Sequence, residues 1–165
     1  MFRHAIRCTA PLLFAFAWLL PFTVRAADTI APSDVPASGI VKVRSAYSVP
    51  ETVARIRKDV ASKGIMFFSE IDQMQLATNA GVSIRPSTLL TFGNPPLGTL
   101  FIRANALAGL DWPVRVLVLQ DENGDVWAAY TDFGWIAHRH AIADADEESF
   151  RKASEVIASI TASIR

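Results

Sequence analysis

Two strand-like segments that flank a tight turn constrain the fold of this chain most. Val114 to Gln120 and Val126 to Thr131 are rich in β-branched and aromatic residues, and Asn123-Gly124 lies between them. An Asn-Gly pair in this setting is typical of a type I′ turn, which joins neighbouring antiparallel strands. A doubly wound parallel sheet and a helical bundle both accommodate such a hairpin poorly. The hairpin therefore predicts an antiparallel sheet at the centre of the fold.

Counting outward from a two-residue Asn123-Gly124 loop predicts the register of this hairpin. Leu117 then faces Tyr130, and Arg115 faces Asp132. Because side chains alternate with a period of two, one face would hold Arg115, Leu117, Leu119, Ala128, Tyr130 and Asp132, and the other Val114, Val116, Val118, Trp127 and Ala129. Both faces are mostly apolar. This indicates an interior hairpin covered on each side, or a hairpin with one face in a pocket or a dimer contact.

Hydrophobic periodicity predicts the remaining elements. Ser48-Val49-Pro50-Glu51 is typical of a capping box at a helix start, and Gly64 is typical of a helix end. The predicted order is β-α-β-(α)-β-α-β-β-(α)-α, in the segments 40–47, 48–64, 65–71, 73–80, 86–92, 98–108, 114–120, 126–131, 133–139 and 146–164. It predicts a two-layer α+β domain, a mainly antiparallel sheet with helices packed on it.

The first 26 residues are typical of a cleaved secretory signal peptide. A basic start and an apolar core (10–22) precede Val24-Arg25-Ala26, and Ala27 is the alternative cleavage position. A transmembrane anchor is the competing interpretation, but the 17 uncharged residues from Cys8 to Val24 contain two prolines and barely span a bilayer. We expect an exported protein, periplasmic or secreted, without stable membrane insertion after cleavage. Its flexible lead-in would span 27–39 and its single domain 40–165.

Loss of the signal peptide changes the charge and the chemistry of the chain. Three of the 16 Lys and Arg lie in it, which leaves 13 basic against 16 acidic residues and a net charge of −3. A mildly acidic chain without a basic block has no electrostatic footprint for nucleic acid. The one cysteine, Cys8, is also lost. This excludes disulfides, a thiol nucleophile and a thiolate metal site in the mature chain.

Several motifs together carry a resemblance to a known family. They are Arg85-Pro86-Ser87-Thr88, Phe92-Gly93-Asn94-Pro95, Gly98-Thr99, Leu110-Asp111-Trp112-Pro113, the segment 121–127 with Tyr130, and His138-Arg139-His140. From about Val43 to Ile142 the chain resembles the domain-of-unknown-function family numbered 302 (DUF302). The resemblance implies a TATA-box-binding-protein-like β-α-β4-α architecture, here with extra short helices, and no assigned activity. Members often have Ile-Asp-His where this chain has Ile71-Asp72-Gln73, so no role for that imidazole is expected.

Five polar residues form the candidate binding site. They lie at strand ends, in rigid loops or on the hairpin, where binding groups are usually mounted: Asp72, Asn94, Asp111, Arg115 and Tyr130. Phe92, Trp112 and Trp135 would wall the pocket. These groups suit a small polar ligand such as a carboxylate or phosphate, with Arg115 as a bidentate clamp.

Each candidate also has a purely structural interpretation. Asn94 could bond its own turn, Asp111 could cap the turn into Trp112, and Tyr130 could belong to the core. Arg115 could be an ordinary cross-strand partner of Asp132.

His138 and His140 could chelate a metal from a strand, but from a helix they would point apart. The segment 133–139 is predicted to be helical and no third ligand is near in sequence, so no metal site is predicted. Surface or helix C-terminal histidines are expected instead.

Three functions are compatible with these observations. The first is a non-catalytic exported module that binds a small polar molecule or a protein partner. The second is a hydrolase- or isomerase-like enzyme that uses Asp72 or Asp111 as an acid or base. The third is an assembly module whose apolar sheet face pairs with another subunit in a homodimer. No cofactor and no nucleic-acid partner are implied.

Overall fold

The computed structural model describes residues 37–142 and 147–165. Five strands in this part form one antiparallel sheet in the order β1-β5-β4-β3-β2. The strands are β1 (Ile40–Ser45), β2 (Met66–Asp72), β3 (Ser87–Gly93), β4 (Val114–Gln120) and β5 (Val126–Thr131). The predicted α+β class is confirmed. The predicted signal peptide and most of the lead-in lie outside the described residues.

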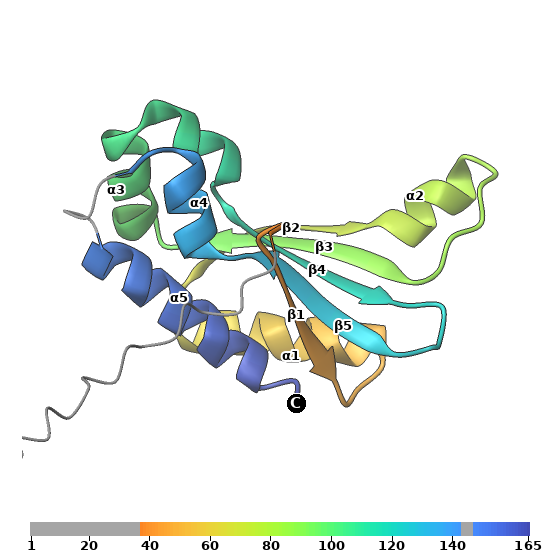
Figure 1. Ribbon diagram of the computed structural model, residues 1–165. Coiled ribbons are helices and arrows are strands. Elements are labelled where there is room, and N and C mark those ends of the chain that lie inside the picture. The colour runs from red at the N-terminus through yellow and green to blue at the C-terminus, as the bar shows by residue number, and fades with distance from the viewer. Residues whose placement is uncertain (1–36, 143–146) are drawn as a thin grey trace, which may run out of the picture. The chain divides into compact units, whose positions relative to one another are not determined.

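Two long helices, α1 (Val49–Ser62) and α5 (Glu147–Ala162), lie on one side of the sheet (Figure 1). Ser48 caps α1 by accepting from the amide of Glu51, as the sequence predicts. The core forms between these helices and the sheet. Its fully buried members include Ile56, Val60, Leu90, Val116, Val118, Ala128, Ile160 and Ile164.

The shorter helices lie toward the two ends of the sheet (Figure 1). Helix α2 (Gln73–Asn79) is at one end, and α3 (Pro95–Ala104), the 3₁₀ helix η1 (Ala106–Asp111) and α4 (Phe133–Arg139) are at the other. The single helix predicted over 98–108 is wrong. Helix α3 begins earlier, at Pro95, because prolines fit the first turn of a helix. It ends before Asn105, whose side chain accepts from the amide of Leu107 and so starts η1.

The predicted hairpin register is also wrong, by one residue. Leu117 lies opposite Ala129, and Gln120 lies opposite Val126. The loop has three residues, not two, because Gly124 adopts a left-handed φ of 85° after a turn closed by its own amide on the carbonyl of Asp121. The predicted grouping of side chains on the two faces is therefore wrong as well. Val116, Val118 and Ala128 share the face under the helices.

Asp121 holds this longer loop closed. Its carboxylate accepts from the amides of Asn123 at 3.0 Å and Asp125 at 2.9 Å, and from the indole of Trp127 at 2.8 Å. The Trp127 hydrogen bond is the main reason why the pKa of Asp121 is below its usual value. A carboxylate that organises the loop thus sets the register of the whole hairpin.

The edge strand β1 is fastened at both ends. Before it, the amide of Asp132 donates to the carbonyl of Gly39 at 2.8 Å, and the indole of Trp135 donates to the carbonyl of Ala37 at 3.2 Å. After it, the amide of Ala46 donates to the carbonyl of Ile164 at 2.9 Å. The strand is thereby joined to α4 and to the end of the chain as well as to β5.

Candidate binding site

Two loops meet at one end of the sheet and build the candidate site. One loop leaves β3 at Gly93-Asn94-Pro95, and the other enters β4 through Asp111-Trp112-Pro113. They are neighbours because β3 and β4 are antiparallel, with Phe92 opposite Val114. The peptide bond between Trp112 and Pro113 is cis.

Trp112 lies in a slot that two glycines leave open. A Cβ atom on Gly93 would lie 2.9 Å from the indole, and one on Gly98 would lie 1.8 Å from it. On α3, the ring of Phe101 stacks on the same indole with centroids 5.9 Å apart. The indole therefore holds α3 close to the end of β3, and no larger residue fits at Gly98 without movement of the ring or the helix.

Asp111 is a buried carboxylate with three basic partners. It is 7% exposed and accepts from Arg115 at 3.1 Å and from Arg139 at 3.3 Å. His140, also 7% exposed, places its Nε2 atom 2.6 Å from the second carboxylate oxygen. Asn105 donates to the carbonyl of His140 at 2.7 Å and joins η1 to the end of α4. The cluster links β4, η1 and α4 through one side chain.

The basic partners differ in their exposure. The side chains of Arg115 and Arg139 are 50% and 48% exposed, whereas that of His140 is 6% exposed. One carboxylate between two guanidinium groups leaves local positive charge at the surface. This arrangement could attract an anion, but the adjoining pocket has a volume of about 10 Å³ and holds at most an ion the size of a water molecule.

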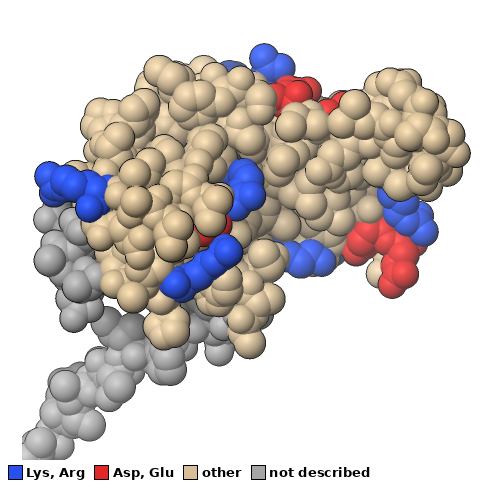
Figure 2. All heavy atoms as spheres, turned by 90° about the horizontal axis from the view of Figure 1, so that it is seen from above, with Lys and Arg blue, Asp and Glu red and all other residues tan. Residues whose placement is uncertain are grey.

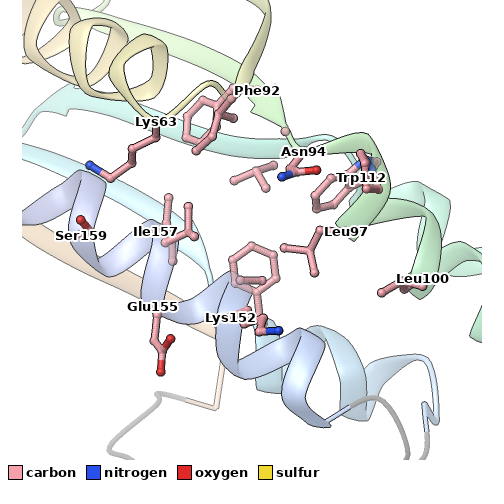
Figure 3. Close-up of a pocket in the computed structure, with 17 residues that line it drawn as sticks. Lys63, Phe92, Asn94, Leu97, Leu100, Trp112, Lys152, Glu155, Ile157 and Ser159 are labelled. Carbon is pink, nitrogen blue, oxygen red and sulfur yellow. The ribbon is translucent and has the colours of Figure 1, made fainter.

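A much larger cavity of about 690 Å³ opens between α3, α5 and the ends of α1 and β3 (Figure 3). Apolar side chains form most of its lining: Ile65, Phe92, Leu97, Leu100, Trp112, Val114, Phe133, Ala153, Val156 and Ile157. The polar lining residues are Lys63, Asn94, Lys152, Glu155 and Ser159. Asn94 precedes α3 but makes no side-chain capping bond to it, so its amide is available to the cavity. A molecule with an apolar body fits this lining.

The structure divides the five predicted site residues among separate places. Asn94 lines the cavity, and Asp111 meets Arg115 beside it. Asp72 is at the other end of β2, where it caps α2 by accepting from the amide of Gln75 at 2.8 Å. Tyr130 lies on the helix side of β5 against the core, and burial raises the pKa of its hydroxyl.

The predicted alternatives for these residues are also resolved. The Arg115–Asp132 cross-strand pair is wrong, because Arg115 bonds Asp111 while Asp132 caps α4 by accepting from the amide of Trp135. Trp135 packs on Gly39 and does not line the cavity.

The two carboxylates of the acid/base hypothesis are far apart. Asp72 lies opposite Thr88, and the β4 end next to Asp111 lies opposite Phe92. Four residues of β3 separate the two positions, which corresponds to about 13 Å along the strand.

Sequence reasoning missed the roles of Arg139 and His140. Arg139 is the last residue of the short helix α4 and His140 follows it, and they lie 28 and 29 residues from their partner Asp111. His138 and His140 were considered as metal ligands from the sequence. No group of three or more metal-ligating side chains occurs within residues 37–142 and 147–165. The cavity wall from α5 was missed too, because its residues form part of the apolar stripe of an ordinary core helix.

Comparisons with known proteins were made on sequence and on structure. A family described as "Domain of unknown function DUF302" matches residues 41–160. Two proteins named fluoride-specific ion channel FluC 1, from Brucella suis biovar 1 and Brucella abortus biovar 1, are each 38% identical over 105 residues, or 64% of this chain. The chain spans 41% and 39% of their lengths.

A solved structure shares the fold. The crystal structure of an uncharacterized conserved DUF302 protein from Bacillus stearothermophilus matches with a TM-score of 0.70 at 18% identity, and covers 78% of this chain and 100% of that one. Within the described part of this chain, no helix has the length and apolar character needed to cross a membrane.

Substitution of Gly98 tests the packing of the Trp112 indole against this position. Gly98→Ala places a methyl group inside the space of the indole, so we expect the free energy of unfolding to fall by about 1–3 kcal/mol. Gly109→Ala is the matched control, because its Cβ would lie 3.9 Å from Ile102, an ordinary contact. Urea unfolding of both variants measures the difference. Equal losses in the two variants would contradict the proposed role of the slot.

Substitution of Asp111 tests the buried cluster. Asp111→Asn removes the charge that Arg115, Arg139 and His140 share, and we expect a loss of about 2 kcal/mol, less than for a fully buried pair because both guanidinium groups are half exposed. Asp125→Asn breaks the exposed pair with Arg44 and should cost less than about 0.5 kcal/mol. Thermal and urea unfolding compare the two. A loss in Asp111→Asn no larger than in the control would show that the cluster does not stabilise the fold.

Proposed function

The chain belongs to the DUF302 family, a family of unknown function. We propose that it is an exported, non-catalytic domain that binds a small amphipathic molecule. The cavity between α3 and α5 carries this proposal. Its volume of about 690 Å³ falls within the range of small-molecule sites, and its lining is mainly apolar with a few polar groups. The proposal keeps the binding function expected from the sequence. It changes the ligand from small and polar to one with an apolar body.

The polar lining suggests how the ligand would be oriented. The amide of Asn94 is free of a capping bond, and the ammonium of Lys63 lies at the end of α1 beside Asp59. Figure 3 shows these two residues on the sheet and α1 sides of the cavity, with Ile157 of α5 and Leu97 of α3 facing the same space. A carboxylate or other acidic head would therefore bind near Lys63 and Asn94, while the apolar body would lie against Phe92 and Trp112.

The alternative function as an enzyme has less support. Asp72 caps a helix, Asp111 is engaged by three basic groups, and about 13 Å of strand separates their positions. Neither carboxylate lines the large cavity. A binding function requires only the cavity itself.

A charge placed in the cavity tests the proposal. Val156 lines the cavity from α5 and is 36% exposed, so Val156→Glu puts a carboxylate in the apolar space without emptying the core. Calorimetric titration with anilinonaphthalene sulfonate, an aromatic body with one acidic head, should give one site in the wild type. We expect binding at least about tenfold weaker in Val156→Glu, because the new carboxylate repels the sulfonate and adds a charge to the apolar space.

Val82→Glu is the matched control for this experiment. Val82 is 54% exposed in the segment after α2 and does not line the cavity, so its replacement should leave the affinity unchanged. Absence of a saturable site in the wild type, or equal affinity in both variants, would refute the binding proposal.

A second candidate is an accessory function toward fluoride. It is favoured by the 38% identity to proteins named fluoride-specific ion channels and by the half-exposed guanidinium groups of Arg115 and Arg139, which could attract a small anion. The fluorine NMR line of sodium fluoride should then broaden with added protein, and Arg115→Ala should reduce this broadening by about half or more. Arg103→Ala, at the exposed end of α3, is the control. Identical lines for all three proteins would exclude this function.

A further inference from the structure

The two faces of the sheet are covered to different extents. Helix α1 contacts β2, β3 and β4, and α5 packs beside α1 on the same side (Figure 1). Strand side chains that point toward these helices are fully buried, among them Leu90, Val116 and Val118. The intervening side chains point to the opposite side, here called the open face. The shorter helices α2, α3 and α4 lie toward its ends, and among residues 37–142 and 147–165 no helix covers its centre (Figure 1).

The centre of the open face is apolar. Ile71 pairs with Leu89, Leu89 with Leu117, and Leu117 with Ala129, so four adjacent strands contribute one continuous line of side chains, here called the apolar row. Leu119 and Trp127 pair beside it. Figure 2 shows a broad stretch without Asp, Glu, Lys or Arg on part of the side seen from above, with charged side chains around it. An antiparallel sheet that faces water normally carries polar side chains there, so this face has the composition of a contact surface.

The basic residues around the apolar row have internal partners. Lys42 lies 4.4 Å from the ring centroid of Trp127, Arg44 bonds Asp125, and Arg115 bonds Asp111. Two of these cations lie on the edge strand β1 and the third on β4, so they form no continuous basic stripe for a phosphate backbone or an acidic surface. The open face therefore favours an apolar partner surface.

We propose that the open face is the interface with a second copy of this chain. The apolar row crosses β4, the central strand of the sheet, at Leu117. A two-fold axis that passes near Leu117 places the row of one copy on the row of the other, which gives an isologous contact of like with like. Such a contact is mainly apolar, and the half-exposed Arg115, two residues from Leu117 on the same face, would lie at its margin with its bond to Asp111.

The size of the face is sufficient for such a dimer. Five strands about 4.8 Å apart and about 20 Å long present a plane of roughly 480 Å² on each copy, or about 1,000 Å² for two, near the lower limit for a specific interface. The exposed side chains of Met66 and Phe68 on the edge strand β2 add to this area. The estimate corresponds to a dimer of moderate affinity.

The oligomeric state of the purified protein tests this proposal. Sedimentation velocity between about 1 and 100 µM should show a concentration-dependent dimer. Leu117→Glu should weaken association at least about tenfold, because it places a carboxylate next to its own copy. Leu110→Glu is the matched control: Leu110 is 67% exposed in η1, outside the open face, and its replacement should leave the dimer intact. Circular dichroism confirms that both variants are folded.

A mixture of two oppositely charged variants tests the interface even if Leu117→Glu alone loses stability. A mixture of Leu117→Glu and Leu117→Lys should form a mixed dimer, since the two-fold axis brings residue 117 against itself. Three results would overturn the proposal: a wild type that is monomeric throughout this range, a dimer that persists in Leu117→Glu, or no mixed dimer between folded variants. A monomer whose Leu117 methyl groups are shielded from a dissolved paramagnetic probe would point to a segment of the same chain as the occupant. A monomer that sediments with phosphatidylcholine vesicles would point to lipid.

Discussion

The packing of the Trp112 indole against Gly93 and Gly98 is the contact on which the cavity end of this domain depends. Residues 94–113 separate β3 from β4, although an antiparallel pair can be joined by a very short loop. A connection of this length keeps one position only if contacts attach it to the sheet. The indole does so because the two missing side chains allow it to lie against the end of β3 and against α3 at once.

Asp111 completes this attachment from the neighbouring position. Its carboxylate connects η1 to β4 through Arg115 and to the end of α4 through Arg139 and His140. A buried carboxylate is costly unless it is paired, so the cluster strongly favours the one arrangement of these elements that satisfies it. The cavity is a consequence of both contacts. Helix α3 is held against the sheet end, α5 is held by its own apolar stripe, and space remains between them.

Local patterns predicted the elements of the fold, but not the distances between them. The alternation of β1, the Ser48 cap and the apolar stripe of α5 were visible in the sequence because each depends on residues within a few positions of one another. The hairpin register was missed because Asn123-Gly124 fits both two-residue and three-residue loops. The carboxylate of Asp121 favours the three-residue loop, since it accepts from the amides of Asn123 and Asp125. The candidate site was only partly predicted for a related reason. Asp111 and Arg115 are four residues apart and were chosen together, whereas His140 is 29 residues away and Asp72 lies at the opposite strand end.

The double fastening of β1 has a mechanical consequence. A pulling force applied to the chain ahead of Ala37 would first load the bonds of Ala37 and Gly39 to α4, and not the ladder between β1 and β5. A force applied at Arg165 would reach the far end of the same strand through Ile164 and Ala46. The edge strand would thus be pulled along its length and not peeled from one end. Tension between the two ends of the domain would therefore run along the covalent backbone of β1 to the Ala46–Ile164 hydrogen bond, and would bypass the ladder between β1 and β5.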